Sequence, residues 1–236
     1  MTQSNITAVV LLLVGCGLLI GGISYWLGPE TNTDIAEEEQ KLEELVAPLS
    51  PDELAAYNVD MTNEKNPVAK FTTNLGVFEI ELFEDTMPIT AGNFIELAEK
   101  HFYDKVKFHR VISDFMIQGG DPNSKTDNAL TYGTGGSGKT IPDEHIKGKY
   151  LTNIRGTISM ANSGPNSGSS QFFINVRDNK SLDFDVPDPN NSAHPVFGQV
   201  ISGMDIVDKI SMVDVNSANN IPLDPVVIES VEILRK

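Results

Sequence analysis

The residues best suited to chemistry in this chain of 236 residues lie in one short segment, residues 108–121, which reads FHRVISDFMIQGGD. A basic side chain, Arg110, and an amide side chain, Gln118, stand among large apolar residues, and a Gly-Gly pair follows them. Because glycine weakens helices, Gly119 and Gly120 oppose a core helix here. The segment predicts a strand, a turn and a second strand, with polar groups that converge on an apolar groove.

A second segment, residues 158–176, has a similar composition and reads ISMANSGPNSGSSQFFINV. Asn162 and Gln171 lie among apolar, strand-like residues, and a loop rich in Gly, Pro, Asn and Ser joins them. This segment also predicts strand, loop and strand.

Periodicity elsewhere in the chain indicates further elements that must position these residues. The expected elements are strands at 70–73, 77–83 and 226–234, an amphipathic helix at 88–100, and a second short helix at 204–210. These patterns alone predict an antiparallel, mostly β domain with few helices.

The two motifs, in this order, resemble the cyclophilin family of peptidyl-prolyl cis/trans isomerases. The likeness covers residues 67–236 and includes the opening KFTTNLGVFEIELFEDTMP and the later HPVFGQVISGMDIVDKI. The resemblance implies a closed eight-stranded antiparallel barrel capped by two helices. Side chains fill the interior of a barrel of this size, so the binding groove is expected on its outer face.

The resemblance also implies a role for each site residue. Arg110, in FHRVI, matches the catalytic arginine of the family. The substrate-binding residues would be Phe115, Met116, Gln118, Ala161, Asn162, Gln171, Phe173, Leu182 and His194. Phe115, Met116, Phe173 and Leu182 would hold the proline ring, while Gln118, Asn162 and Gln171 would bind the substrate backbone. No metal and no cofactor is expected.

Rotation about a peptide bond crosses a barrier of about 20 kcal/mol, because amide resonance is lost in the twisted state. No bond breaks, so a groove that prefers the twisted imide is sufficient for catalysis. A guanidinium near the proline nitrogen can donate a hydrogen bond to the emerging lone pair, and its charge needs no titration. His109 is expected to support the fold through hydrogen bonds, since rotation needs no base.

Each of these residues also has a simpler interpretation. Phe115, Met116, Phe172 and Phe173 are each candidates for ordinary core, and Arg110 could be an incidental surface charge. Where the family often has an aromatic residue at the groove rim, this chain has Ser181. Phe184 is the candidate to compensate. We therefore expect weaker binding of cyclosporin-type ligands than in relatives that carry the aromatic residue.

Residues 6–27 form an uncharged, mostly apolar run, which at about 1.5 Å per residue can cross a bilayer core of about 30 Å. This predicts a transmembrane anchor in residues 1–28. A cleaved signal peptide is the competing interpretation, but residues 1–5 lack the basic start that it needs. Lipidation at Cys16 is a further alternative. We expect a single-pass anchor with the domain outside the cytoplasm.

Residues 29–66 carry 11 acids and 2 bases, a net charge of −9, and residues 67–236 carry 22 acids and 15 bases, a net charge of −7, which together give −16. The first stretch is expected to be an acidic linker with short helices that extends by self-repulsion. An acidic chain without a basic stripe argues against nucleic acid as a partner. Proline-containing polypeptides are the expected partners.

Three functions remain open. The first is a membrane-tethered prolyl isomerase that assists slow folding steps. The second is a chaperone-like module that binds proline-containing segments, with incidental turnover. The third is nucleotide binding by GTGGSGKT, residues 133–140, which fits a phosphate-binding pattern by its letters. Ile141-Pro142 follows that motif where a helix should begin, so its context opposes the third reading.

Overall fold

The computed structural model describes residues 65–145, 151–184 and 193–235. All described residues belong to one compact unit, Tyr57–Lys236. The predicted anchor, and the short helices expected in the acidic linker, lie outside the described residues. Within the described ranges, no helix is both long and apolar enough to cross a membrane.

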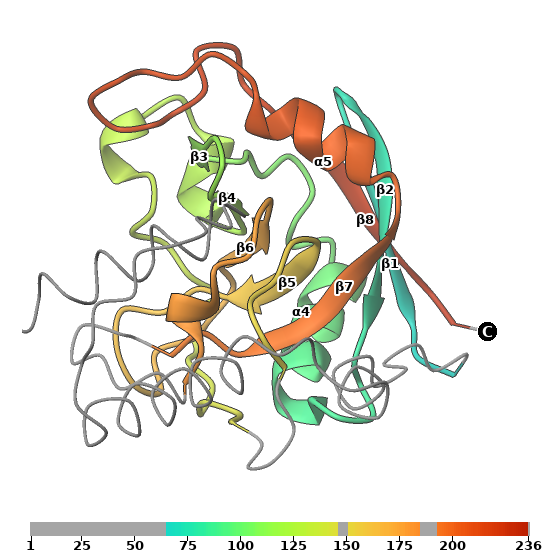
Figure 1. Cartoon of the computed structure of the whole chain (residues 1–236). Helices are drawn as coiled ribbons and strands as arrows, with labels where there is room; N and C mark the ends of the chain where they lie inside the picture. Colours follow the sequence, from blue (N-terminus) through green and yellow to red (C-terminus); the bar gives the residue numbers. More distant parts are fainter. Residues whose placement is uncertain (1–64, 146–150, 185–192, 236) are drawn as a thin grey trace, which may run out of the picture. The chain divides into compact units, whose positions relative to one another are not determined.

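Eight antiparallel strands form one strongly curved sheet in the order β3-β4-β6-β5-β7-β2-β1-β8 (Figure 1). The strands are β1 Val68–Thr73, β2 Gly76–Leu82, β3 Arg110–Ile112, β4 Met116–Gly119, β5 Thr157–Met160, β6 Phe172–Asn175, β7 Val196–Ser202 and β8 Ile228–Leu234. The predicted strands and both strand-turn-strand segments are confirmed to within a few residues.

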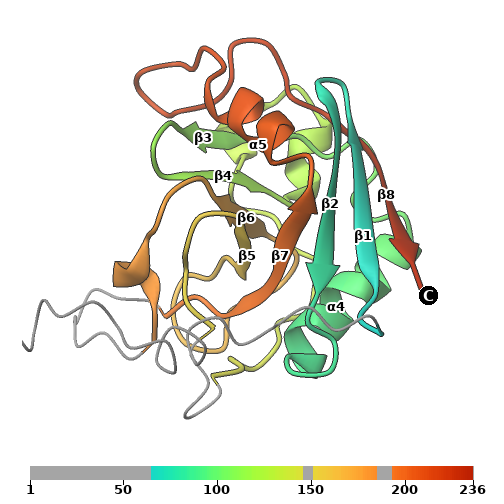
Figure 2. The same cartoon turned by 45° about the vertical axis from the view of Figure 1, so that its right-hand side comes forward.

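Two α-helices cover the sheet: α4, Pro88–Glu99, packs against β8 and β7, and α5, Met204–Ser211, packs against β2 and β4. The two views show them at opposite ends of the curved sheet (Figures 1 and 2). Three short 3-10 helices complete the described elements: η1 Pro122–Lys125, η2 Ala129–Thr131 and η3 Lys180–Leu182.

The prediction of a closed barrel is wrong, although its eight strands and two helices are confirmed. The end strands β3 and β8 do not pair with each other. β3 is only three residues long, and the N–H of Val111 in β3 donates to the carbonyl of Asn220, in a loop, at 2.9 Å. The two ends of the sheet meet just before these strands, where backbone hydrogen bonds and a bridge between Lys107 and Val227 join residues 105–108 to residues 226–228. The sheet is therefore a curled half-barrel.

The concave side of the sheet and α4 enclose an aromatic core. Its rings are Phe71, Phe78, Phe94, Tyr103, Phe172 and Phe197, all at most 1% exposed. Phe71 and Phe78 stack with centroids 4.7 Å apart, and Phe172 meets Phe94 edge to face at 5.6 Å.

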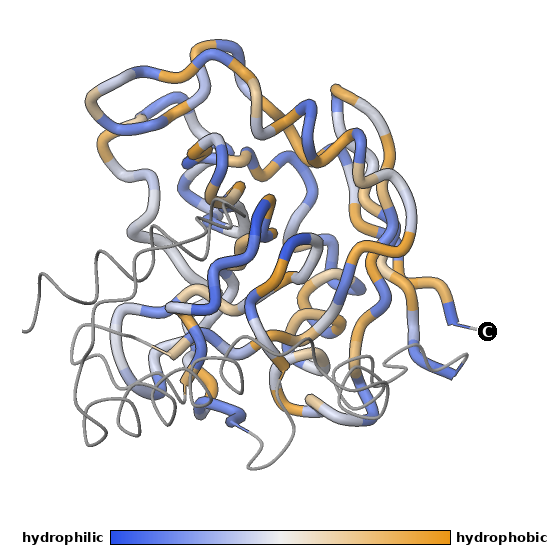
Figure 3. Tube along the Cα trace, in the orientation of Figure 1, coloured by the Kyte–Doolittle hydropathy of each residue, from blue (hydrophilic) through white to orange (hydrophobic). Residues whose placement is uncertain are grey.

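Alternation along the strands decides which side chains enter this core. In β2, Phe78 and Ile80 are buried while Glu79 between them is partly exposed, and the hydropathy colours alternate along the same strand (Figure 3). In β6, Phe172 and Ile174 point into the core, so Phe173 lies on the opposite face. That opposite face carries the candidate site.

Candidate active site

A pocket of about 650 Å³ lies on the outer face of the sheet, beside β3, β4 and β6. It contains every substrate-binding residue expected from the sequence except Gln171, together with Arg110. The expected residues that line it are Arg110, Phe115, Met116, Gln118, Ala161, Asn162, Phe173, Leu182 and His194. The two motifs therefore meet at one site, because β4 pairs with β6 in the sheet.

Arg110 opens β3 directly opposite Gln118 of β4, and its side chain is half-buried. Its Nη1 donates to Oε1 of Gln118 at 3.3 Å. Among the described residues, no carboxylate forms an ion pair with it. Burial lowers the pKa of Arg110 from its ordinary value, but a guanidinium keeps its proton in proteins. The pocket therefore holds a permanent positive charge that can donate further hydrogen bonds.

Two amide side chains hold this guanidinium in place. Nε2 of Gln118 donates to Oε1 of Gln171 at 3.0 Å, and Nε2 of Gln171 donates to the carbonyls of Gly133 and Gly135 at 3.0 and 2.8 Å. Gln171 thus lies behind Gln118 and is not among the residues that line the pocket. In this structure it orients Gln118, and through Gln118 it orients Arg110.

The apolar end of the pocket is built around Phe173 and His194. Their rings meet edge to face with centroids 5.2 Å apart. Nδ1 of His194 lies 3.0 Å from the carbonyl of Met160, so this nitrogen carries the hydrogen. Burial lowers the pKa of His194, and its ring is neutral near pH 7. A neutral ring beside a buried phenyl group suits an apolar ligand.

The simpler interpretation as core holds for Phe172 but not for Phe173, which is 5% exposed and lines the pocket. Met116 is also nearly buried and contributes to the pocket floor. His109 is 4% exposed, and burial lowers its pKa. Neither ring nitrogen of His109 has a hydrogen-bond partner among the described residues, so the expected support of the fold through hydrogen bonds is not confirmed.

The rim residue that was expected to compensate for Ser181 does not do so. The ring of Phe184 stacks on His145, with centroids 4.9 Å apart and an interplanar angle of 16°, and it does not line the pocket. Ser181 is exposed and is also absent from the lining. No aromatic side chain among the described residues replaces the missing one at this rim.

The segment 133–140 is a loop tied to the site. The N–H of Gly133 donates to the buried carboxylate of Asp121, and Gly133 and Gly135 accept from Gln171. No helix begins within residues 141–145. This geometry lacks the helix N-terminus on which a phosphate-binding loop depends.

The opposite wall of the pocket was not expected from the sequence. It consists of Ala129, Leu130, Tyr132, Gly133, Asn219 and Ile221. These residues come from two loops whose positions depend on long-range packing. The one local signal was Leu130, a large apolar residue in the otherwise polar stretch KTDNALTYG.

Comparisons with known proteins agree with this geometry. Residues 68–233 match the family described as "Cyclophilin type peptidyl-prolyl cis-trans isomerase/CLD". A peptidyl-prolyl cis-trans isomerase of Acinetobacter baylyi is 42% identical over 172 residues, which cover 71% of this chain and 86% of the relative. The peptidyl-prolyl cis-trans isomerase-like 2 of Cryptococcus neoformans is 38% identical over 213 residues, which cover 89% of this chain but only 34% of that longer relative.

A crystal structure of a Cryptosporidium parvum cyclophilin type peptidyl-prolyl cis-trans isomerase has a TM-score of 0.62 and 29% identity, and the match covers 72% of this chain and 99% of that one. The same protein in the presence of the dipeptide Ala-Pro matches with a TM-score of 0.61. The family model matches most of this chain, and the expected site residues other than Gln171 line one pocket. The chain therefore belongs to the cyclophilin-type peptidyl-prolyl cis-trans isomerase family.

Proposed function

We propose that this protein catalyses cis/trans rotation about X-Pro bonds of polypeptides and so assists protein folding. The observation that carries the proposal is the position of Arg110, a guanidinium without an ion-pair partner in the described ranges, in the same pocket as Phe115 and Phe173. The activity in the names of the relatives supports the proposal.

The proline ring would enter the apolar end of the pocket, against Phe173 and His194. With the proline ring in this position, the imide nitrogen of the X-Pro bond would lie near Arg110. A donor at that position stabilises the pyramidal nitrogen of the twisted state more than the planar nitrogen of either isomer, which lowers the barrier. Each factor of ten in rate requires about 1.4 kcal/mol of such selective stabilisation. The neutral His194 takes no part in proton transfer, because none is needed.

Exchange NMR on a short Ala-Pro peptide tests this function. The purified chain at catalytic concentration should raise the cis/trans exchange rate well above the uncatalysed rate, which corresponds to tens of seconds or longer per event. If the peptide binds but its exchange rate stays at the uncatalysed value, the protein is a proline-segment binding module instead.

The membrane anchor in residues 1–28 and the extracytoplasmic position of the domain are part of the proposal. The uncharged apolar run at 6–27 supports the anchor. Fractionation of cells should place the full chain in the membrane pellet, and protease added to intact cells should cleave the domain. Recovery in the soluble fraction would refute the anchor, and protection of a membrane-bound chain would refute the orientation.

The lack of an aromatic side chain at this rim among the described residues supports the expectation of weaker cyclosporin binding than in relatives that carry one. Neither Ser181 nor Phe184 lines the pocket, so a bulky apolar ligand loses one aromatic contact there. Calorimetry should give a dissociation constant well above the nanomolar range.

A further inference from the structure

Leu130 is an exposed apolar side chain at the mouth of the pocket. It is 93% exposed, the highest value among the large hydrophobic residues that the structure describes, and it lies in η2, Ala129–Thr131. It also lines the pocket that contains Arg110. A leucine in that position loses the stabilisation that burial would give it.

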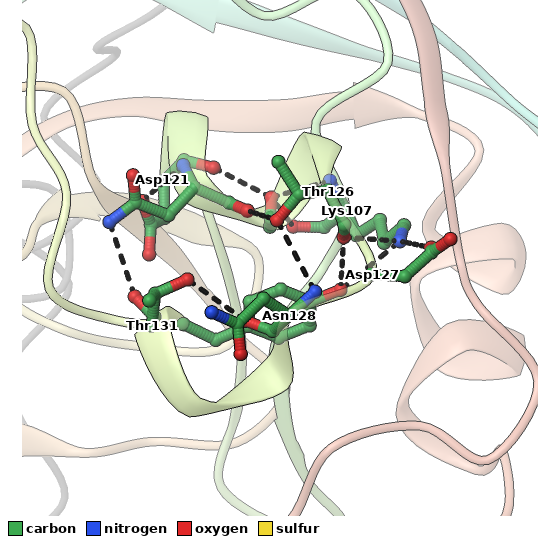
Figure 4. Close-up of polar contacts among 9 residues, drawn as sticks. Lys107, Asp121, Thr126, Asp127, Asn128 and Thr131 are labelled. Carbon is green, nitrogen blue, oxygen red and sulfur yellow. Dashed lines mark hydrogen bonds and ion pairs between the residues drawn. The ribbon is translucent and has the colours of Figure 1, made fainter.

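The exposure of Leu130 does not result from a loose turn. Figure 4 shows polar contacts of the turn that carries η2, with Thr126, Asn128 and Thr131 labelled. Nδ2 of Asn123 donates to the carbonyl of Thr131 at 3.2 Å, Oγ1 of Thr131 donates to the carbonyl of Asn128 at 2.9 Å, and the N–H of Asn128 donates to Oγ1 of Thr126 at 3.3 Å. These bonds hold η2 in one arrangement, so the leucine is presented to solvent at a preorganised position.

A second hollow, of about 180 Å³, adjoins the pocket at this wall. Both hollows are lined by His109, Ala129, Tyr132 and Ile221, which therefore form the boundary between them. Phe108, Pro222 and Pro225 add further apolar surface to the second hollow. One water takes up about 30 Å³ of liquid, so the hollow has room for a large side chain.

The charged groups of the second hollow are already paired with each other. Nζ of Lys107 donates to the carbonyl of Thr126 at 2.9 Å, to the carboxylate of Asp127 at 3.1 Å and to the hydroxyl of Tyr132 at 3.1 Å. A lysine has three donors, so none remains for a ligand. The remaining lining is apolar except for His109, whose two ring nitrogens are buried. The accessible surface of the hollow therefore suits an uncharged, apolar occupant.

We propose that this wall is a second subsite of the groove, in which a large apolar side chain of the bound polypeptide packs against Leu130 and enters the hollow beside Ile221. The inference rests on the proposed function, because the same polypeptide would place its proline against Phe173 and His194. The protein would then favour substrates with a leucine or phenylalanine near the proline.

A peptide scan tests the subsite. Peptides with an Ala-Pro core and alanine elsewhere receive one leucine at each position in turn, on either side of the proline. At one position, leucine should raise kcat/KM about tenfold over alanine, which corresponds to about 1.4 kcal/mol. Leu130→Ser should abolish that gain. Leu223→Ser is the matched control, because Leu223 is 63% exposed but lines neither hollow, and this variant should keep the gain.

The methyl resonances of Leu130 separate failure of the subsite from failure of the proposed function. They should shift on addition of the favoured leucine peptide and not with its alanine counterpart. If the methyl groups shift but no peptide is isomerised, the subsite stands and the enzyme function falls. If leucine gives no gain at any position and the methyl groups do not shift, or if Leu130→Ser keeps the gain, the subsite is refuted.

Discussion

The orientation of Arg110 depends on a chain of hydrogen bonds through two amide side chains. Arg110 donates to Gln118, and Gln118 donates to Gln171. Gln171 in turn donates to the carbonyls of Gly133 and Gly135. A hydrogen bond to a charged group contributes about 1.5–3 kcal/mol. Loss of the Gln171 amide leaves the Gln118 side chain free to rotate, and the guanidinium of Arg110 then loses its fixed direction.

Gln171→Leu should therefore lower kcat about tenfold, the equivalent of about 1.4 kcal/mol, with a smaller change in KM. Exchange NMR and initial-rate kinetics on the Ala-Pro peptide measure both. Gln199→Leu is the matched control, because Gln199 lies in β7 and lines neither hollow. Equal kinetics of Gln171→Leu and the wild type would show that Arg110 does not depend on this chain of amides.

Also at the scale of residues, the sequence identifies the site residues within the two motifs better than the site residues that come from other segments. Arg110, Phe115 and Phe173 all lie in the pocket as expected, because each motif folds as a local strand-turn-strand unit. Asn219 and Ile221 were missed, since only the long-range position of their loop brings them to the wall. Phe184 was predicted to lie at the rim, but its ring stacks on His145 instead.

At the scale of elements, a buried polar network connects β5 and β6 to the segment that carries His194. Both the main-chain N–H and Nδ2 of Asn153 donate to Oδ1 of Asp183, at 2.7 and 2.8 Å. Nδ2 of Asn153 also donates to the carbonyl of His194 at 3.2 Å, and its Oδ1 accepts from Ser159 at 2.7 Å. Asn153 is 0% exposed. The network therefore helps to fix the position of His194 at the apolar end of the pocket.

Asn153→Ala should lower the free energy of unfolding by about 2 kcal/mol, because it leaves several buried polar groups without partners. It should also weaken peptide binding, since His194 loses one support. Chemical denaturation and calorimetry measure the two effects. Asn128→Ala is the control, as Asn128 is exposed and uses only its main chain in the contacts of η2, and it should change stability by less than about 0.5 kcal/mol. Equal stability of the two variants would contradict the role of the network.

The elements themselves were largely predictable, but the closure of the sheet was not. The helical period of 88–100 predicted α4, and the strand-like run at 77–83 predicted β2. Closure would require β3 and β8 to pair along their full length, but the N–H of Val111 in β3 bonds to the loop residue Asn220 instead. No pattern within either strand encodes that choice.

At the scale of the whole molecule, three histidines make stability depend on pH. Burial lowers the pKa of His109, His145 and His194 from the ordinary value of 6.5. Below pH 6.5 the unfolded chain therefore binds protons that the folded chain does not bind. This contribution to stability is complete above pH 6.5 and is lost as the pH falls towards the lower pKa values of the folded state.

The free energy of unfolding should accordingly be lower at about pH 5 than at about pH 7.5, in the range above the titration of most carboxylates. His194→Gln should reduce this difference, because it removes one of the three groups. Urea denaturation at the two pH values provides the measurement. A chain that is equally stable at both, or more stable at the lower pH, would not hold these histidines in their neutral form.

The account depends most on the claim that Arg110 stabilises the twisted imide rather than the bound ground state. Arg110→Ala should lower kcat about a hundredfold, as loss of one preorganised donor does in other enzymes, and should change the dissociation constant of the Ala-Pro peptide less than about threefold. Exchange NMR gives the rate, calorimetry gives the affinity, and an unchanged melting temperature confirms the fold. A variant that isomerises the peptide within twofold of the wild-type rate would contradict the claim.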